Sequence, residues 1–372
     1  MKFQIEKNII LEALSNVSRA LSQKITIPVL SGIKFELTKK NLILTASDSE
    51  LTIKVVIPET DIKNVDSIGD CIIQSKYITE IIRKMPSNIV CFESNEHKVK
   101  IFSDTNEYNL NCFDLKDYPN FNIQFSKECL QVSSLDFKNA IAQTSYSMST
   151  QELRPLLTGT NLILNGNKLC LITTDSYRLA KKVINITSSI KDDVNIVIPG
   201  RTINELTKIL HDDDKLLDIY IFSNKIVISY DNITIQSNLL SGSFPETSHF
   251  IPDNFAYMIN LDLNVFYAAI DRASLLSLSK EKSFIKFNIT AKEMLITSIN
   301  EEVGRTEERI SIESNKIDNL LISMNSKYLL DALKVFKDDN IMFLLNSESQ
   351  PVVIKEVGDE NLTALILPIQ NY

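Results

Sequence analysis

The sequence predicts an α+β protein of three similar domains, each with two helices packed on antiparallel sheet. The first observation behind this fold class is a repeated pattern, seen in LILTASDSELTIKV at 42–55, LCLITTDSYRLAKKV at 169–183 and MLITSINEEVGR at 294–305. Asp48, Asp175 and Asn300 align in this pattern and are separated by 127 and 125 residues. A repeat of that length in a chain of 372 residues predicts three structural units.

Two further series recur in the same register. A basic residue opens an amphipathic run in IQSKYITEIIRKM, IPGRTINELTKIL and MNSKYLLDALKVF, at Lys76, Arg201 and Lys327. A dipeptide of a large hydrophobic residue and proline closes each third, at Tyr118-Pro119, Phe244-Pro245 and Leu367-Pro368. Three independent series in one register make chance similarity a poor explanation of the repeat.

Each third is expected to begin with a short strand and then a helix. Phe3 and Ile5 have strand spacing, and Ile10, Leu14 and Val17 have helical spacing. Residues 129–145 and 257–273 repeat this plan. Strands follow, then the second helix, which begins at the basic residue of each amphipathic run, and then more strands.

The clearest strands lie between Ile219 and Leu239. Apolar and polar residues alternate there, which indicates strands with one buried and one solvated face, as in antiparallel sheet. Ser223-Asn224 and Asp231-Asn232 interrupt the alternation and suit tight hairpin turns.

Domain boundaries are expected near 122–128 and 246–256, after the dipeptides Tyr118-Pro119 and Phe244-Pro245. The second of these linkers, ETSHFIPDNFA, is polar and contains Pro252, as is typical of an interdomain connection. The predicted domains are therefore residues 1–125, 126–252 and 253–372.

Composition favours an ordered cytoplasmic protein. Hydrophobic residues make up 44% of the chain, which is enough for an ordinary core in each third. The start, MKFQIEKNII, has no apolar signal region, and no run approaches the roughly 20 apolar residues of a membrane span. Five cysteines, none in a CxxC pair, are expected to be reduced thiols rather than a disulfide or zinc framework.

Basic residues seven positions apart recur in the second helix of each third. Seven residues are nearly two turns, so the members of a pair share one helix face, away from the apolar stripe. A solvated surface would explain one such pair, but recurrence in all three repeats favours a polyanion as partner. The net charge of −8 does not exclude this interpretation, because the predicted helices are net basic and the rest of the chain is acidic. The pairs are Lys76 and Arg83, Arg201 and Lys208, and Lys327 and Lys334.

No combination of side chains predicts catalysis or a cofactor. His97, His211 and His249 are scattered, and the phosphate-binding, hydrolase and zinc-protease motifs are absent from the sequence. The acidic run at 212–214 follows a predicted helix directly and has no second cluster, so we interpret it as a solvated turn rather than a metal site.

Several motifs together resemble the bacterial DNA polymerase III β subunit family, the sliding clamps. The resemblance covers the whole chain and is carried by TTDSYRLA, the three-fold layout, the start MKFQIEKNIILEAL, KITIPVLSGI at 24–33, DYPNF, FPE and the ending LILPIQNY. It implies a head-to-tail homodimer whose six domains close a ring, with helices lining a hole through which duplex DNA passes. Phosphate contacts in such a ring carry no sequence information and permit sliding.

The resemblance also implies particular contacts. Lys24 and Gln151 match positions near DNA in the family, and they join the six basic helix residues as expected DNA contacts. Leu275 and Leu276, after the first helix of the last third, are expected to meet the partner subunit around Tyr108 and Leu110.

A pocket for partner peptides is implied in the same way. Its expected partners are the catalytic subunit of DNA polymerase III, the clamp loader and other proteins with a clamp-binding motif. Ser176 departs from the glycine of some members, and Gln370 from a common arginine. The pocket residues expected by similarity are Leu157, Thr174, Tyr177, Arg178, Leu179, Pro245, Phe250, Asn325, Tyr328, Ile366, Leu367, Pro368 and Ile369.

Two alternatives from other classes stay open on the sequence alone. One is a scaffold of β-rich repeats that does not bind DNA, which a monomeric solution mass would favour. The other is a metal-dependent hydrolase that uses Asp212 to Asp214, which turnover abolished by changing those aspartates would favour.

Overall fold

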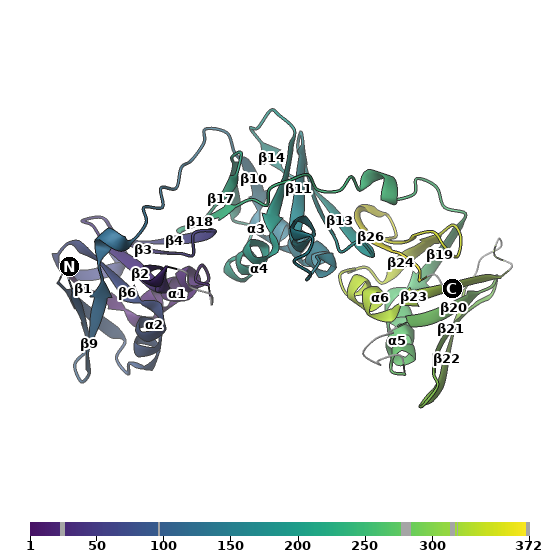
Figure 1. Ribbon diagram of the computed structural model, residues 1–372, viewed down its shortest axis with the longest axis horizontal. Helices are drawn as coiled ribbons and strands as arrows, with labels where there is room; N and C mark the ends of the chain where they lie inside the picture. Colours follow the sequence, from purple (N-terminus) through teal and green to yellow (C-terminus); the bar gives the residue numbers. More distant parts are fainter. Residues whose placement is uncertain (23–26, 96, 277–283, 313–316, 318, 370–372) are drawn as a thin grey trace. The chain divides into compact units, whose positions relative to one another are not determined.

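In the residues that the structure describes, each third of the chain contains two α-helices, as the repeat predicts (Figure 1). The computed structural model describes residues 1–22, 27–95, 97–276, 284–312, 317 and 319–369. The first helix of each third follows a short strand: α1 (Lys7–Ser18) follows β1 (Lys2–Glu6), α3 (Ser134–Thr144) follows β10 (Leu130–Ser133), and α5 (Leu263–Ser274) follows β19 (Tyr257–Asp262). The second helices are α2 (Ser75–Lys84), α4 (Gly200–Ile209) and α6 (Ser326–Leu333).

Every second helix begins one residue before the predicted basic residue, at a small residue. Ser75 and Ser326 are buried there, and a Cβ added to Gly200 would clash with the carbonyl oxygen of Thr158. Close packing at this point therefore admits only small side chains. The basic residue that follows is turned outward, as the amphipathic pattern predicts.

The strands of each third form two groups of four with the same order in all three. All described strand pairs are antiparallel. One group runs β6-β2-β3-β4 in the first third, β15-β11-β12-β13 in the second and β23-β20-β21-β22 in the last. The other runs β1-β7-β8-β9, β10-β16-β17-β18 and β19-β24-β25-β26.

The bounds of these strands follow the repeat. In the first third they are β2 (Gly32–Leu37), β3 (Asn41–Ser47), β4 (Leu51–Pro58), β6 (Gly69–Gln74), β7 (Ile89–Ser94), β8 (Lys98–Phe102) and β9 (Glu107–Phe113), with β5 (Ile62–Ser67) added beside β1. In the second they are β11 (Gly159–Asn165), β12 (Lys168–Thr174), β13 (Arg178–Asn185), β15 (Val194–Pro199), β16 (Leu216–Ile221), β17 (Lys225–Tyr230) and β18 (Ile233–Asn238), with β14 (Thr187–Ser188) beside β10. In the last they are β20 (Phe284–Ile289), β21 (Glu293–Asn300), β22 (Gly304–Ser311), β23 (Leu320–Asn325), β24 (Asn340–Leu345), β25 (Val352–Glu356) and β26 (Asp359–Ile366).

The predicted hairpins of the second third are confirmed. β16, β17 and β18 form a meander whose turns lie at Ser223-Asn224 and Asp231-Asn232. Asp231 has a φ of 53°, the left-handed conformation that a tight turn of this kind requires.

Strand pairs continue the sheets from one third into the next. β4 pairs with β18, from Leu51 opposite Ser237 to Val55 opposite Ile233. In the same way β13 pairs with β26, from Arg178 opposite Ile366 to Lys182 opposite Leu362. An edge strand of one third is thus covered by an edge strand of the next, which satisfies backbone groups that would otherwise be open to pairing.

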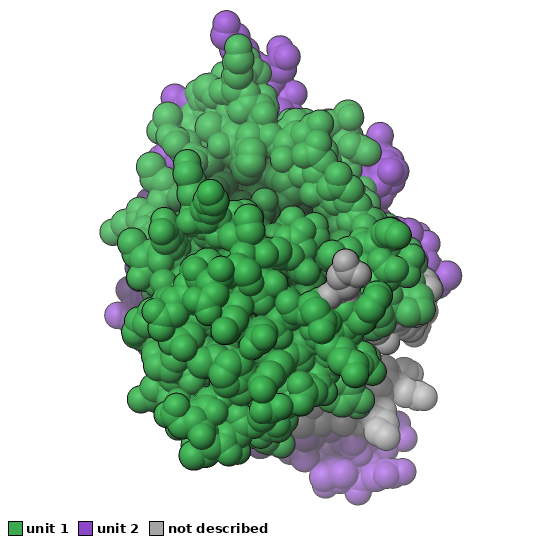
Figure 2. Space-filling view, turned by 90° about the vertical axis from the view of Figure 1, so that its left-hand side faces the viewer, with its two compact units in different colours: residues 1–135, 187–190, 204–239 green, residues 136–186, 191–203, 240–372 purple. Residues whose placement is uncertain are grey.

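These strand pairs explain why the chain packs as two compact units rather than three (Figure 2). Unit 1 comprises residues 1–135, 187–190 and 204–239, and unit 2 comprises residues 136–186, 191–203 and 240–372. The division passes through α3 and α4, so each unit takes part of the second third together with one outer third. The division given by packing thus differs from the domain boundaries given by the linkers. Those boundaries stay a prediction.

Apolar helix faces and sheets build the core of each unit. In unit 1 Leu14 of α1 and Ile78 and Ile82 of α2 are fully buried, as the helical spacing predicts. In unit 2 the rings of Phe266, Phe287 and Phe343 pack with centroids 5.4 to 6.3 Å apart, which joins α5 to β20 and β24. All five cysteines are free thiols. In the described ranges, no helix has both the length and the apolar character needed to span a membrane.

Candidate functional site

The turn between β12 and β13 places the residues of the TTDSYR motif. The Asp175 carboxylate accepts hydrogen bonds from the backbone N–H groups of Tyr177 (2.9 Å) and Arg178 (3.1 Å), and Thr174 Oγ1 donates to the Arg178 carbonyl (2.6 Å). Ser176 has a φ of 80°, which is strained for a residue with a Cβ. The first repeat builds the same turn, with Asp48 accepting from the Leu51 N–H (2.9 Å) and Ser49 also at a φ of 80°.

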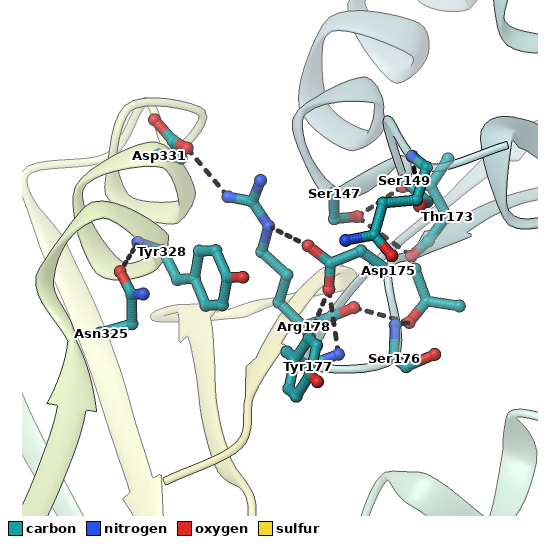
Figure 3. Close-up of polar contacts among 12 residues, drawn as sticks. Ser147, Ser149, Thr173, Asp175, Ser176, Tyr177, Arg178, Asn325, Tyr328 and Asp331 are labelled. Carbon is teal, nitrogen blue, oxygen red and sulfur yellow. Dashed lines mark hydrogen bonds and ion pairs between the residues drawn. The ribbon is translucent and has the colours of Figure 1, made fainter. Parts of the chain in front are cut away.

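Arg178 is the centre of a buried polar cluster (Figure 3). Its Nε donates to Asp175 (3.0 Å), and its Nη1 donates to Asp331 of α6 (2.8 Å). The guanidinium lies 4.4 Å from the ring centroid of Tyr328 and 5.5 Å from that of Tyr146. Only 9% of Arg178 is exposed, so two carboxylates and two aromatic rings hold it in one orientation.

The phenols beside Arg178 stay neutral. Burial raises the pKa of Tyr146, an effect that outweighs the lowering by the nearby Arg178 charge, and burial also raises the pKa of Tyr328. Because both phenols are neutral, their rings face the guanidinium without placing a further negative charge beside Asp175 and Asp331.

A cavity of about 890 Å³ opens beside this cluster, entirely within unit 2. Its floor and walls are mostly apolar, and its polar groups come from a few side chains on different elements, the arrangement typical of a small-ligand or peptide site. The lining residues are Arg154, Pro155, Leu156, Leu157, Thr174, Ser176, Tyr177, Arg178, Leu179, Ser241, Ser243, Pro245, His249, Phe250, Pro252, Asn346, Gln350, Pro351, Leu365 and Leu367.

A second cavity of about 500 Å³ adjoins the first, because Tyr177 and Leu367 line both. The chain after β26 forms one of its walls: the Leu367 N–H donates to the Tyr177 carbonyl (2.8 Å) and the Ile369 N–H donates to the Ser323 carbonyl (2.7 Å). Pro368 lies beyond the strand, as expected for a residue without an N–H. The lining residues are Tyr177, Asn325, Tyr328, Ser349, Leu367, Pro368 and Ile369.

The structure brings twelve of the thirteen expected pocket residues to these two cavities. Ile366 is the exception, and the expectation was wrong for its side chain. It is 0% exposed and belongs to the core of the last third, because in β26 it points to the opposite face from Leu365 and Leu367. Leu179 is also nearly buried, but it lines the larger cavity.

Sequence reasoning missed the residues that position Arg178. Asp175 stands in the repeated motif and could have been found from its counterpart Asp48. Asp331 and Tyr146 had no such signal, because their contacts with Arg178 join positions that are distant in the chain. Arg154 was missed as well.

The basic residues of the second helices are exposed where the structure describes them. Lys76 and Arg83 lie in the first and last turns of α2, and Arg201 and Lys208 lie in α4. Lys327 lies in α6, but Lys334 is one residue beyond its end. Arg83 pairs with Glu80, and Lys208 pairs with Glu205 (2.8 Å), so both charges are partly neutralised. Gln151 is also exposed, and Lys24 lies outside the described residues.

The residues expected at the subunit interface lie at surface positions of separate units. Leu275 follows α5 directly and is 64% exposed, and Leu276 is half-buried. Tyr108 and Leu110 are half-buried on β9. All four side chains thus leave apolar surface that a second copy of the chain could cover.

The acidic run at 212–214 has a structural use. Asp213 accepts hydrogen bonds from the hydroxyl groups of Ser134 (2.7 Å) and Tyr230 (3.1 Å), and these bonds lower the pKa of its carboxyl group. Asp213 thereby ties the start of α3 to β17. In the described part of the chain, no group of three metal-binding side chains comes together.

Comparisons with known proteins cover the whole chain. The family models of the DNA polymerase III beta subunit match in order: the N-terminal domain at residues 1–122, the central domain at 131–246 and the C-terminal domain at 248–370. Beta sliding clamps of Staphylococcus aureus and Staphylococcus epidermidis are each 34% identical over 377 residues, with 100% of both chains covered. Among solved structures, the DNA polymerase sliding clamp from Bacillus subtilis matches with a TM-score of 0.96 at 34% identity, and the DNA polymerase III beta chain from Streptococcus pneumoniae matches with 0.94 at 28%, both over 100% of each chain.

Proposed function

The chain belongs to the DNA polymerase III β subunit family, the sliding clamps, and from this premise we propose that its two adjoining cavities bind short peptide segments of replication proteins. The protein is a DNA-encircling processivity clamp and is not an enzyme. Its sites therefore hold partners rather than transform them.

The observation that carries the peptide proposal is the pair of cavities joined at Tyr177 and Leu367. Leu157, Leu179 and Phe250 give the larger cavity apolar walls that can bury leucine or phenylalanine anchors, and a few such anchors usually supply most of the binding energy. The smaller cavity adds the Asn325 amide and the Tyr328 ring. Because Arg178 is already fixed, little side-chain order has to be gained on binding.

The partners that fit this site carry a glutamine followed by leucine and phenylalanine. A glutamine amide can exchange hydrogen bonds with the polar wall, and the apolar pair fills the larger cavity. We expect such segments in the catalytic subunit of DNA polymerase III, in the clamp loader and in other proteins with a clamp-binding motif. We place this chain in the cytoplasm together with these partners.

The way the thirds join supports our proposal of a homodimer. β4 of the first third pairs with β18 of the second third, and β13 of the second third pairs with β26 of the last. In both pairs the last strand of one four-stranded group meets the last strand of the other group in the next third. By the same rule we expect β22 to meet β9 of a second copy. Among the described residues, β22 pairs only with β21. A heterologous contact of this kind, made twice, closes a head-to-tail dimer of six domains, with boundaries at 1–125, 126–252 and 253–372 in each chain.

DNA contact is assigned to the basic faces of the second helices. Lys76, Arg201 and Lys327 recur at equivalent exposed positions, and exposed cations can contact phosphates without reading sequence. Lys24, Gln151, Arg83, Lys208 and Lys334 complete the proposed contacts.

Removal of residues 367–372 tests the peptide site. The truncation deletes one wall of both cavities and the hydrogen bond from the Leu367 N–H to Tyr177, so binding of a fluorescent peptide with glutamine, leucine and phenylalanine should be lost in anisotropy titrations. Dimer mass and retention on nicked circular DNA should be unchanged, because β26 and the helices are untouched. Unchanged peptide affinity in a truncated dimer would place the site elsewhere.

A further inference from the structure

A cavity of about 460 Å³ in unit 1 has no part in the function proposed above. Its floor comes from β2, β3, β4 and β18, and the segment 118–125, which leads from the first third to the second, lines it as well. The Tyr118 hydroxyl group donates to the Thr45 carbonyl (3.2 Å), which ties this segment to the sheet. We call this cavity the linker cavity of unit 1.

The floor of the linker cavity is a row of lysine and threonine residues across four strands. Lys34 of β2 is opposite Thr45 of β3, and Thr45 is opposite Lys54 of β4. On its other side Lys54 is opposite Thr234 of β18, so the four side chains lie on one face of the sheet. Lys34 pairs with Glu36 (2.9 Å), the single acidic residue in the described lining. No carboxylate in the described ranges forms an ion pair with Lys54, so its half-buried charge is uncompensated.

A cavity of about 500 Å³ in unit 2 occupies the equivalent position in the repeat. Lys181 stands 127 residues after Lys54, and it is opposite Thr363 of β26 as Lys54 is opposite Thr234. Here three lysines and three acidic residues share the lining, and two of the acids, Glu246 and Asp253, come from the segment that leads to the last third. The unit 2 cavity thus contains carboxylates to balance its lysines.

The segment of the linker cavity differs from its counterpart in charge. Residues 118–125 read YPNFNIQF and contain no charged side chain. They line the cavity with the amides of Asn120 and Asn122 and with aromatic rings. Phe121 packs edge-on against Tyr118, with ring centroids 5.7 Å apart, and Phe125 is 55% exposed. An unmatched cation, amide donors and open aromatic surface therefore meet in one cavity.

We propose that the linker cavity of unit 1 binds a ligand that combines a carboxylate with an aromatic ring. The carboxylate pairs with the Lys54 ammonium group, and the ring packs against Phe121 and Phe125. A free aromatic acid and a peptide with an acidic residue beside phenylalanine share this chemistry. Because Lys54 is only half-buried, solvent partly screens the pair, and the expected preference for a carboxylate over an uncharged amide is about fivefold in Kd. The inference does not depend on the peptide site in unit 2.

Two matched pairs of probes test the proposal by saturation-transfer NMR titrations of the full-length protein. One pair is N-acetylphenylalanine and its uncharged amide, and the other is the capped peptides Gly-Asp-Phe-Gly and Gly-Asn-Phe-Gly. In at least one pair the acid should bind about fivefold more tightly than its uncharged partner. A preference in the first pair alone would identify the ligand as a free acid, and a preference in the second alone would identify it as a peptide segment.

Three variants locate the preference. Lys54→Gln should remove it while the uncharged probes keep their affinity. Asn120→Asp gives the segment a carboxylate, as in the unit 2 cavity, and should also reduce the preference, because the new charge competes for Lys54. Lys181→Gln makes the matched change in the equivalent cavity and should keep the wild-type preference.

A further control separates this site from the peptide site. The variant that lacks residues 367–372 is altered in unit 2 alone, so it should keep the preference whether or not the peptide site of unit 2 exists. Equal binding of acid and uncharged probe in both pairs, or binding of none of them, would overturn the proposal. A preference that is retained in Lys54→Gln, or lost in the truncated variant, would overturn it as well.

Discussion

Arg178 shows how far local sequence can identify a side chain of the candidate site. The family resemblance carried by TTDSYRLA placed Arg178 in the expected pocket, and the turn that presents it is made from consecutive residues. The groups that fix the guanidinium come from α6 and from the segment after α3, and packing between distant segments leaves no periodic trace in the sequence. For the same reason Ile366 was assigned to the pocket although it faces the core.

Arg178→Ala should destabilise unit 2 strongly. The change leaves Asp175 and Asp331 without their cation in a mostly buried place, and removing one partner of such a pair costs about 2–4 kcal/mol. The free energy of unfolding in urea, followed by circular dichroism, measures the loss. Arg83→Ala is the matched control: its pair with Glu80 is exposed, so the change should be within about 0.5 kcal/mol. Equal effects of the two variants would contradict the assigned role of Arg178.

The ion pair between Arg272 of α5 and Glu308 of β22 should make stability depend on pH. Hydrogen bonds from Arg272 at 2.8 and 3.0 Å lower the pKa of Glu308. A lowered carboxyl pKa gives stability that is present above the unfolded value of about 4.3 and is lost as the pH falls through the folded value. Glu308→Gln should therefore lower Tm at pH 7 but have little effect near pH 3. A Tm difference that is the same at both pH values would contradict this assignment.

At the scale of elements, the repeat predicted more than single-segment patterns could. The spacing of apolar residues alone cannot place a helix boundary. The aligned positions of Lys76, Arg201 and Lys327 located the starts of α2, α4 and α6 to within one residue. What the repeat did not reveal is the acidic residue between the two cations of each pair. Glu80 and Glu205 neutralise the second cation of α2 and α4, whereas the equivalent Asp331 binds Arg178 instead.

The first cation of each second helix is the better candidate for phosphate contact, because it recurs at the same exposed helix position in all three thirds. Replacing Lys76, Arg201 and Lys327 together by glutamate should weaken retention on nicked circular DNA and flatten its salt dependence, because fewer counterions are released on binding. The same charge change in exposed turns between strands, at Lys39, Lys40 and Lys292, is the matched control and should have a smaller effect. Similar losses in both triple variants would show that total charge, and not the helix faces, governs retention.

At the scale of the whole molecule, linkers and packing divide the chain differently, and both divisions have a physical basis. Polar segments at 122–128 and 246–256, each of which follows an aromatic residue paired with proline, marked three domains in the sequence. The pairs β4–β18 and β13–β26 bind neighbouring thirds so closely that the chain packs as two units instead. Such pairings between distant strands are set by edge geometry, which the sequence does not display.

The same edge geometry governs the expected closure of the ring. Among the described residues β22 pairs only with β21, and its expected counterpart in the proposed ring is β9 of a second copy. Leu275, 64% exposed just after α5, belongs to the same third. Replacing Leu275 and Leu276 by aspartate puts two charges where an apolar contact with Tyr108 and Leu110 of another subunit is expected, and charge buried without a partner is strongly unfavourable. The variant should be a folded monomer in sedimentation and should be lost from nicked circular DNA, while it still binds the peptide, because both cavities lie within unit 2.

Val265→Asp changes another exposed apolar residue, in the first turn of α5, and should remain a dimer. A dimer mass for the double aspartate variant would move the interface away from Leu275 and Leu276.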